Sequence, residues 1–95
     1  MIKDYVHQHF KKHKGPVRPS IKMFDGTSLS VQASQYHYCE PRIDNADKYL
    51  TVEVYCWPLN ETFFEHYGGD DNNPAGYVDV KIVNFYILKH GGAID

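Results

Sequence analysis

Apolar and polar residues alternate with a helical period over residues 2–14. One face of the predicted helix carries Ile2, Tyr5, Val6, His9, Phe10 and His13. Lysines gather in its last turn, where positive charge is favourable beside the helix dipole. Gly15-Pro16 ends the helix, since proline cannot continue it. A helix this short is marginal alone, so we expect its apolar face to dock on the rest of the chain.

A period of two, typical of β-strands, follows in residues 17–23 and 27–34. In the second segment, Leu29, Val31 and Ala33 alternate with small polar residues. Successive side chains of a strand point to opposite faces, so one face of this strand is apolar. The two segments together predict a β-hairpin.

The loop between these strands sets their register. A three-residue loop at 24–26 pairs Ile21 with Leu29 and places Gly26 in the left-handed region. A two-residue turn would instead set Ile21 opposite Ser30 and mix the two faces. We therefore predict the three-residue loop.

Residues 49–57 give the clearest strand pattern. Alternate positions form an apolar face that we expect in the core: Leu50, Val52, Val54 and Cys56. The positions between them form a second, mostly aromatic face: Tyr49, Thr51, Glu53, Tyr55 and Trp57. Pro58 ends the strand. The second face is either an exposed binding surface or a side of the core that the helices cover, and the sequence leaves both open.

The segment from residue 77 to residue 90 fits two structures. We predict a brief strand at 77–78, then Asp79 as the cap of a helix that runs to His90 and stops at two glycines. The alternative is a strand that continues to Tyr86.

These elements predict an α+β fold. We expect one domain, 1–95, with a three- or four-stranded antiparallel sheet packed by an N-terminal and a C-terminal helix. The N-terminal helix occupies 1–15, the sheet 17–57 and the C-terminal helix 79–90, with a short helix at 61–67 between them.

Composition narrows the functional class. The chain has 95 residues, of which 15% are aromatic, enough large side chains for one core. A net charge of −2 argues against a dedicated nucleic-acid-binding protein, which would usually be basic. The chain has no run of about 18 apolar residues and no signal-peptide pattern, so we expect a cytoplasmic protein without a membrane span.

Histidine and cysteine residues occur at spacings that could suggest a metal site or a catalytic thiol. His9 and His13 lie one helical turn apart, but a structural zinc site takes four ligands. His37 and Cys39 lie close together, yet Glu40 and Pro41 follow, not a glycine-rich turn or a helix start that could supply an oxyanion hole. We predict partly buried histidines, a buried Cys39, no cofactor and no catalysis.

A binding surface remains the best candidate. Tyrosine, tryptophan and arginine dominate the energetic centres of protein interfaces, and they gather in the 36–42 loop and the second face of the 49–57 strand. The predicted binding residues are Tyr36, His37, Tyr38, Arg42, Tyr49, Glu53, Tyr55 and Trp57.

The sequence resembles small uncharacterised phage and prophage proteins. The likeness lies in Ser30-Val31-Gln32-Ala33-Ser34 and in Tyr36-His37-Tyr38-Cys39 with Pro41-Arg42. It extends to Val52-Glu53-Val54 and to the segment from Tyr77 to Gly92. Those proteins have a helix in the last segment, although this chain has Asp79 where proline is expected. The resemblance implies a phage or mobile-element setting.

Size, mild acidity and the aromatic face lead us to expect a non-catalytic protein that binds a host protein or protein complex, as an anti-CRISPR inhibitor does. A homodimer is also compatible with a free aromatic edge. The alternative is a small anionic-ligand (nucleotide) binding protein or enzyme centred on Tyr36, His37, Cys39 and Arg42.

Overall fold

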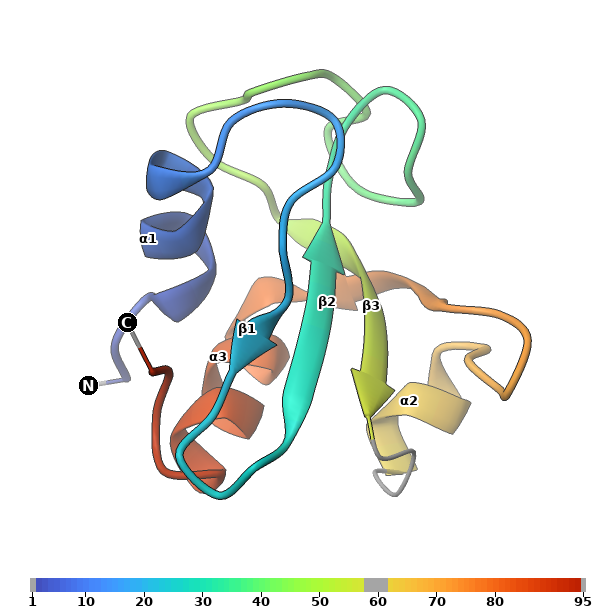
Figure 1. The fold of residues 1–95 in the computed structure, drawn as a ribbon. Helices are drawn as coiled ribbons and strands as arrows, with labels where there is room; N and C mark the ends of the chain where they lie inside the picture. The colour runs from blue at the N-terminus through green and yellow to red at the C-terminus, as the bar shows by residue number, and fades with distance from the viewer. Residues whose placement is uncertain (1, 58–61, 95) are drawn as a thin grey trace.

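The computed structural model describes residues 2–57 and 62–94. Its elements are α1 (Tyr5–Lys12), β1 (Ile21–Lys22), β2 (Ser28–Gln32), β3 (Thr51–Trp57), α2 (Thr62–His66), β4 (Ala75–Asp79) and α3 (Val80–Lys89). The strands form an antiparallel sheet in the order β1-β2-β3-β4 (Figure 1). The predicted α+β class is confirmed, with four strands in the sheet.

The register of the β1–β2 hairpin agrees with the prediction. Ile21 pairs with Leu29, and the N–H of Met23 donates to the carbonyl of Thr27 over 2.9 Å. Gly26 has a φ of +92°, a conformation that glycine adopts without steric cost. The three-residue loop therefore sets apolar residues opposite each other.

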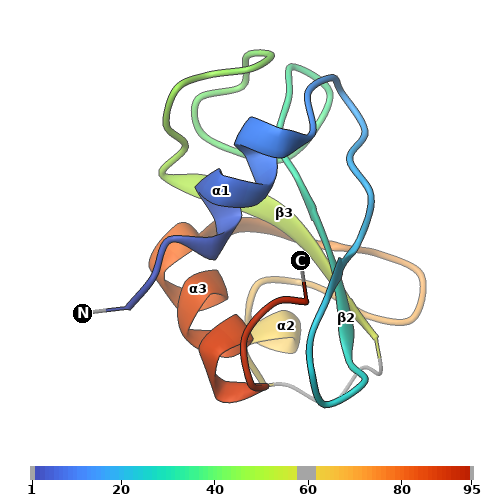
Figure 2. The same ribbon diagram turned by 60° about the vertical axis from the view of Figure 1, so that its left-hand side comes forward.

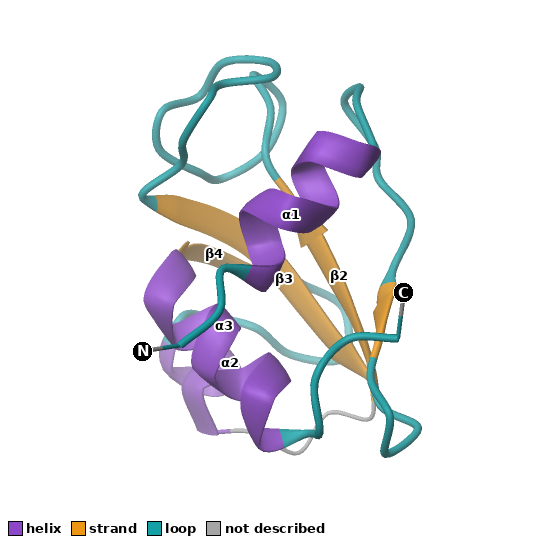
Figure 3. Cartoon of the chain, turned by 90° about the vertical axis from the view of Figure 1, so that its left-hand side faces the viewer, coloured by secondary structure: helices purple, strands orange, loops and turns teal. Residues whose placement is uncertain are grey.

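One face of the sheet is buried under α1 and α3 (Figures 2 and 3). Buried side chains come from β2, β3 and both helices: Leu29, Val31, Val52, Val54, Cys56, Val6, Phe10, Val83, Tyr86 and Ile87. Sheet and helix residues form one continuous apolar cluster. The short N-terminal helix is thus stabilised by docking, as its amphipathic pattern predicts.

The two residues just before β3 have the reverse of the predicted burial. Leu50, expected in the core, is 74% exposed, and Tyr49, expected on the outer face, is only 2% exposed. The Tyr49 ring packs edge-on against Phe10 with centroids 5.6 Å apart. Strand β3 begins only at Thr51, so its two-residue period does not extend back to these positions.

The first predicted strand is shorter than its pattern suggests, because only Ile21 and Lys22 pair regularly with β2. Nearer the start of the segment, the Gln32 side chain bonds the backbone of Arg18 instead. Its Oε1 accepts from the Arg18 N–H and its Nε2 donates to the Arg18 carbonyl, both over 2.8 Å. Pro19 has no N–H to give to a ladder.

The C-terminal prediction is confirmed. Residues 75–79 form β4, and a carboxylate oxygen of Asp79 accepts from the Lys81 N–H over 2.8 Å at the start of α3. The short helix predicted at 61–67 is present as α2, while Pro58, the predicted end of the strand before it, lies outside the described residues. Within the described part of the chain, no helix is long and apolar enough to cross a membrane.

Candidate functional site

The 36–42 loop lies between β2 and β3 and is fixed by backbone hydrogen bonds to neighbouring elements. The carbonyl of Tyr38 accepts from the Tyr77 N–H over 3.0 Å. The carbonyl of Glu40 accepts from the Leu50 N–H over 2.8 Å, and Glu40 forms an isolated bridge with Thr51. The loop is therefore held against β4 on one side and the start of β3 on the other.

Three exposed side chains meet at this loop. The rings of Tyr38 and Tyr77 lie 5.9 Å apart between centroids, and the Arg42 guanidinium lies 5.5 Å above the Tyr38 ring. Tyr38 is 54% exposed and Tyr77 is 44% exposed. We call Tyr38, Arg42 and Tyr77 the Tyr38 cluster.

Tyr77 has an unusual backbone conformation. Its φ is +54°, a left-handed value that is unfavourable for a bulky side chain. It lies in a β-bulge, since Val54 pairs with Ala75 and Val52 with Val78, which leaves two residues of β4 opposite one of β3. The bulge directs the Tyr77 ring onto Tyr38.

The side chains of His37, a residue of this loop, and Glu53 of β3 are largely buried and support the loop from below. Nδ1 of His37 and the Ser34 hydroxyl lie 2.7 Å apart, and Nε2 of His37 lies 4.0 Å from a Glu53 carboxylate oxygen. The other carboxylate oxygen of Glu53 accepts from the Tyr38 N–H over 3.5 Å. Both side chains are largely buried. They orient the loop more than they offer a surface of their own.

Cys39 is buried, as the sequence predicts. Burial is the largest influence on its thiol and raises the pKa. The thiol donates to the Ser34 carbonyl over 3.3 Å. A nucleophilic cysteine needs the opposite shift. Cys39 and Cys56 are both buried and are not joined in a disulfide.

The structure divides the predicted binding residues into three groups. His37, Tyr38, Arg42 and Glu53 come together at the loop, with Tyr36 exposed beside them. Tyr55 and Trp57 lie further along β3, where Trp57 pairs with Ser28 at the far end of the strand. Tyr49 is in the core and cannot contribute to a surface.

Tyr55 shows that the outer face of β3 is partly covered. Its ring packs edge-on against Phe64 of α2 at 5.5 Å, and its hydroxyl donates to the Asp71 carbonyl over 3.2 Å. Trp57 remains exposed. The face is therefore neither a fully open surface nor a second core.

Sequence reasoning missed Tyr77, the partner of Tyr38. The one signal was Gly76 before it: a Cβ at Gly76 would lie 3.0 Å from the Cβ of Tyr38. A glycine that permits close backbone approach is visible in a sequence, but the residue that approaches it is not.

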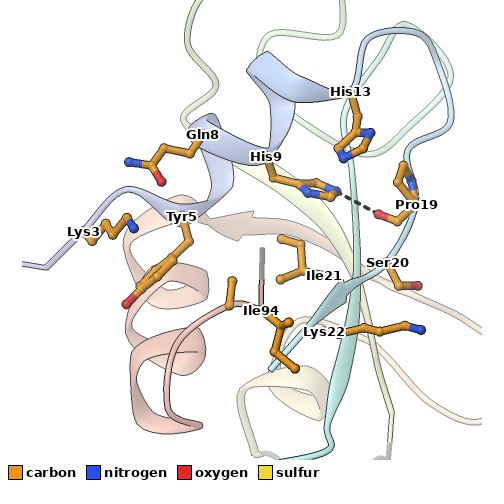
Figure 4. A pocket seen from close by; sticks show the side chains of 11 residues that line it. Lys3, Tyr5, Gln8, His9, His13, Pro19, Ser20, Ile21, Lys22 and Ile94 are labelled. Atoms are coloured by element: carbon orange, nitrogen blue, oxygen red, sulfur yellow. Dashed lines mark hydrogen bonds between the residues drawn. The ribbon is translucent and has the colours of Figure 1, made fainter. Parts of the chain in front are cut away.

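A cavity of about 170 Å³ lies between α1 and the segment around β1 (Figure 4). His9 points across it, and its Nε2 donates to the Pro19 carbonyl over 2.8 Å. The His9 and His13 rings lie 4.6 Å apart. Among the described residues, no group of three or more histidine, cysteine or acidic side chains is placed to hold a metal ion.

The cavity in Figure 4 does not involve the Tyr38 cluster. A second cavity, between α1 and residues 45–47, is separate from the cluster as well. Neither of these two cavities is lined by a residue of the Tyr38 cluster. Comparisons of the chain with protein families, curated proteins and solved structures found no match.

Proposed function

We propose that this is a non-catalytic protein that binds another protein through the Tyr38 cluster. The observation that carries the proposal is the exposure of two tyrosines and an arginine in one rigid arrangement. Tyrosine and arginine are enriched where interface energy concentrates. Because backbone bonds already fix the loop, little conformational entropy is lost on binding.

Arg42 suggests the chemistry of the partner. In the described part of the chain, no residue accepts a hydrogen bond from its guanidinium, which only stacks on Tyr38. Its donors are available to a carboxylate, which arginine can bind through two parallel bonds. We therefore infer that the partner presents an acidic side chain to the Tyr38 cluster.

The more specific form of the proposal is a phage-type inhibitor of a host defence system, comparable to an anti-CRISPR protein. It is supported by the resemblance of the 30–42 segment to phage and prophage proteins and by the small size of the chain. The partner would then be a host protein or protein complex in the cytoplasm.

The geometry favours this function over an anionic-ligand site or an enzyme at Tyr36, His37, Cys39 and Arg42. The Cys39 thiol is buried and its pKa is raised. Arg42 lines neither of the two cavities described above. Small-ligand sites are usually cavities, and Tyr36, His37 and Cys39 likewise line neither of these two.

The test is affinity capture from bacterial lysate with quantitative mass spectrometry. Arg42→Glu and Tyr38→Ala should each reduce capture of a stoichiometric partner by at least about tenfold, since both alter the centre of the surface. Phe85→Ala is the matched control, because Phe85 is an exposed aromatic residue on α3, outside the cluster. Circular dichroism verifies that each variant is folded.

Equal capture by all variants would exclude the Tyr38 cluster as the binding surface. If the capture recovers only the protein's own chain, and size-exclusion chromatography gives twice the monomer mass, the surface mediates a homodimer and not binding to a host protein.

A further inference from the structure

The cavity between α1 and residues 45–47 has a volume of about 120 Å³. One water molecule needs about 10–15 Å³ by the same kind of measure, so the cavity can hold a small polyatomic ion. Its lining residues are mostly basic, polar or aromatic: His7, Phe10, Lys11, Lys14, Arg18, Asn45, Ala46 and Asp47.

Arg18 forms the buried wall of this cavity and is only 3% exposed. Its Nε donates to the His13 carbonyl and one Nη to the Ala33 carbonyl, both over 2.8 Å. The other Nη lies 3.5 Å from the Asn45 side-chain oxygen. The guanidinium stacks 4.0 Å above the Phe10 ring.

These contacts include no salt bridge. The nearby Asp44 carboxylate receives its hydrogen bonds from Gln35, which lower its pKa, and Arg18 helps to lower that pKa as well. No carboxylate among residues 2–57 and 62–94 lies within salt-bridge distance of the guanidinium. A guanidinium has five N–H donors, and the three contacts with protein oxygens engage three of them. A buried cation is costly unless an opposite charge compensates it.

The other lining residues add positive charge. Lys11 and Lys14 extend from the end of α1, and Asp47 is the one carboxylate in the lining. Three cations and one carboxylate give the lining a net charge of +2 with His7 neutral. Both ring nitrogens of His7 are occupied, by Asp4 and by the Tyr49 N–H.

Asn45 holds the opposite wall in place. Its φ is +49°, a conformation that asparagine tolerates better than most residues. Its side-chain oxygen accepts from the Gly15 N–H over 3.2 Å as well as facing Arg18. The wall is therefore fixed relative to the guanidinium before any ligand arrives.

We propose that this cavity binds a phosphate group, either as the free ion or as a phosphate monoester. Arg18 supplies a buried positive charge and the two N–H donors that its three protein contacts leave over, and Lys11 and Lys14 supply charge at the mouth. The site is independent of the Tyr38 cluster and does not rest on the protein-binding function.

The experiment is a titration of the full chain with sodium phosphate, compared with sodium chloride at equal ionic strength. We expect a saturable rise in melting temperature and saturable amide shifts in NMR spectra at residues 11–15 and 45–47. Phosphate also stabilises proteins without binding, by exclusion from their surface. Specific binding is therefore judged by comparing the phosphate response of two variants with that of the wild type.

The test variant is Lys11→Gln with Lys14→Gln, both on exposed residues. It should weaken phosphate binding by about tenfold in total, given the usual strength of surface charge pairs. The control is Lys3→Gln with Lys22→Gln, which makes the same charge change at the cavity of Figure 4. It should bind phosphate like the wild type.

Two results would overturn the proposal: a phosphate response that is not saturable, or equal weakening by both double variants. A repeat with adenosine 5′-monophosphate separates the two sources. Tighter binding of the monoester identifies a phosphorylated ligand, and binding of inorganic phosphate alone identifies the free ion.

Discussion

At the scale of single residues, His7 illustrates a role that periodicity does not reveal. Its Nε2 accepts from the Tyr49 N–H over 2.9 Å, so the imidazole is neutral with its hydrogen on Nδ1, next to Asp4. Burial raises the pKa of Asp4, but hydrogen bonds from His7 and Asn84 outweigh this and hold the pKa below its usual value. A helical residue thus satisfies a buried backbone donor near the start of β3.

Tyr77 allows a residue-scale prediction. We expect Tyr77→Gly to be more stable than Tyr77→Ala by about 1 kcal/mol, because only glycine takes a left-handed φ without steric cost. Both variants lose the ring, so their difference isolates the backbone conformation. Urea denaturation measures it, and an alanine variant as stable as the glycine variant would contradict the strained conformation.

At the scale of elements, the start of helix α3 is stabilised by a hydrogen bond between its N-cap residue, Asp79, and Lys81. The Asp79 carboxylate accepts from the Lys81 N–H, one of the donors that a helix leaves free at its start. Sequence alone placed this cap correctly, because an acidic residue before an apolar helical face is a strong local signal.

Replacing this cap gives the element-scale prediction. Asp79→Ala should lower the free energy of unfolding by about 1 kcal/mol, while Asp79→Ser, which keeps an acceptor, should lose much less. Chemical denaturation of both variants provides the measurement. Equal losses would mean that the carboxylate acts other than as a cap.

At the scale of the whole molecule, Asp25 joins the β1–β2 loop to the end of α3. Its carboxylate accepts from the Thr27 hydroxyl over 2.6 Å and pairs with Nδ1 of His90. The Thr27 bond, followed by the His90 bond, lowers the pKa of Asp25 to about 2. Two segments far apart in sequence are thereby linked through one ionised group.

This link predicts a pH dependence. The folded-state pKa of Asp25, about 2, lies below the usual unfolded value of about 3.9. Its stabilising effect is therefore complete above about pH 5 and is lost progressively as the pH falls through about 2. Asp25→Asn should be less stable than the wild type at about pH 6, and the difference should vanish near pH 2.

Urea midpoints at the two pH values measure this difference. Asp71→Asn is the control, because the Asp71 side chain accepts no hydrogen bond from a described residue. A stability gap for Asp25→Asn that persists near pH 2 would show that the carboxylate acts through its shape and not its charge.

The sequence by itself determined the local structure. Periodicity, turn glycines and caps encode the hairpin register at Ile21 and Leu29, the amphipathic α1 and the start of α3 at Asp79. These features depend on interactions between residues close along the chain, which a pattern can express. The α+β class followed from their order.

Only the tertiary structure decided which chemically interesting residues meet. Tyr38 and Tyr77 are far apart in sequence, as are Arg18 and Asn45. Each pair is brought together by the tertiary fold, which the hydrophobic periodicity of one segment does not encode. The same applies to Tyr49 and Leu50, whose burial depends on where β3 begins and on the position of Phe10. Contacts between distant segments arise from the close packing of side chains in the folded protein. The pattern of apolar and polar residues in a single segment does not predict which distant side chains pack together.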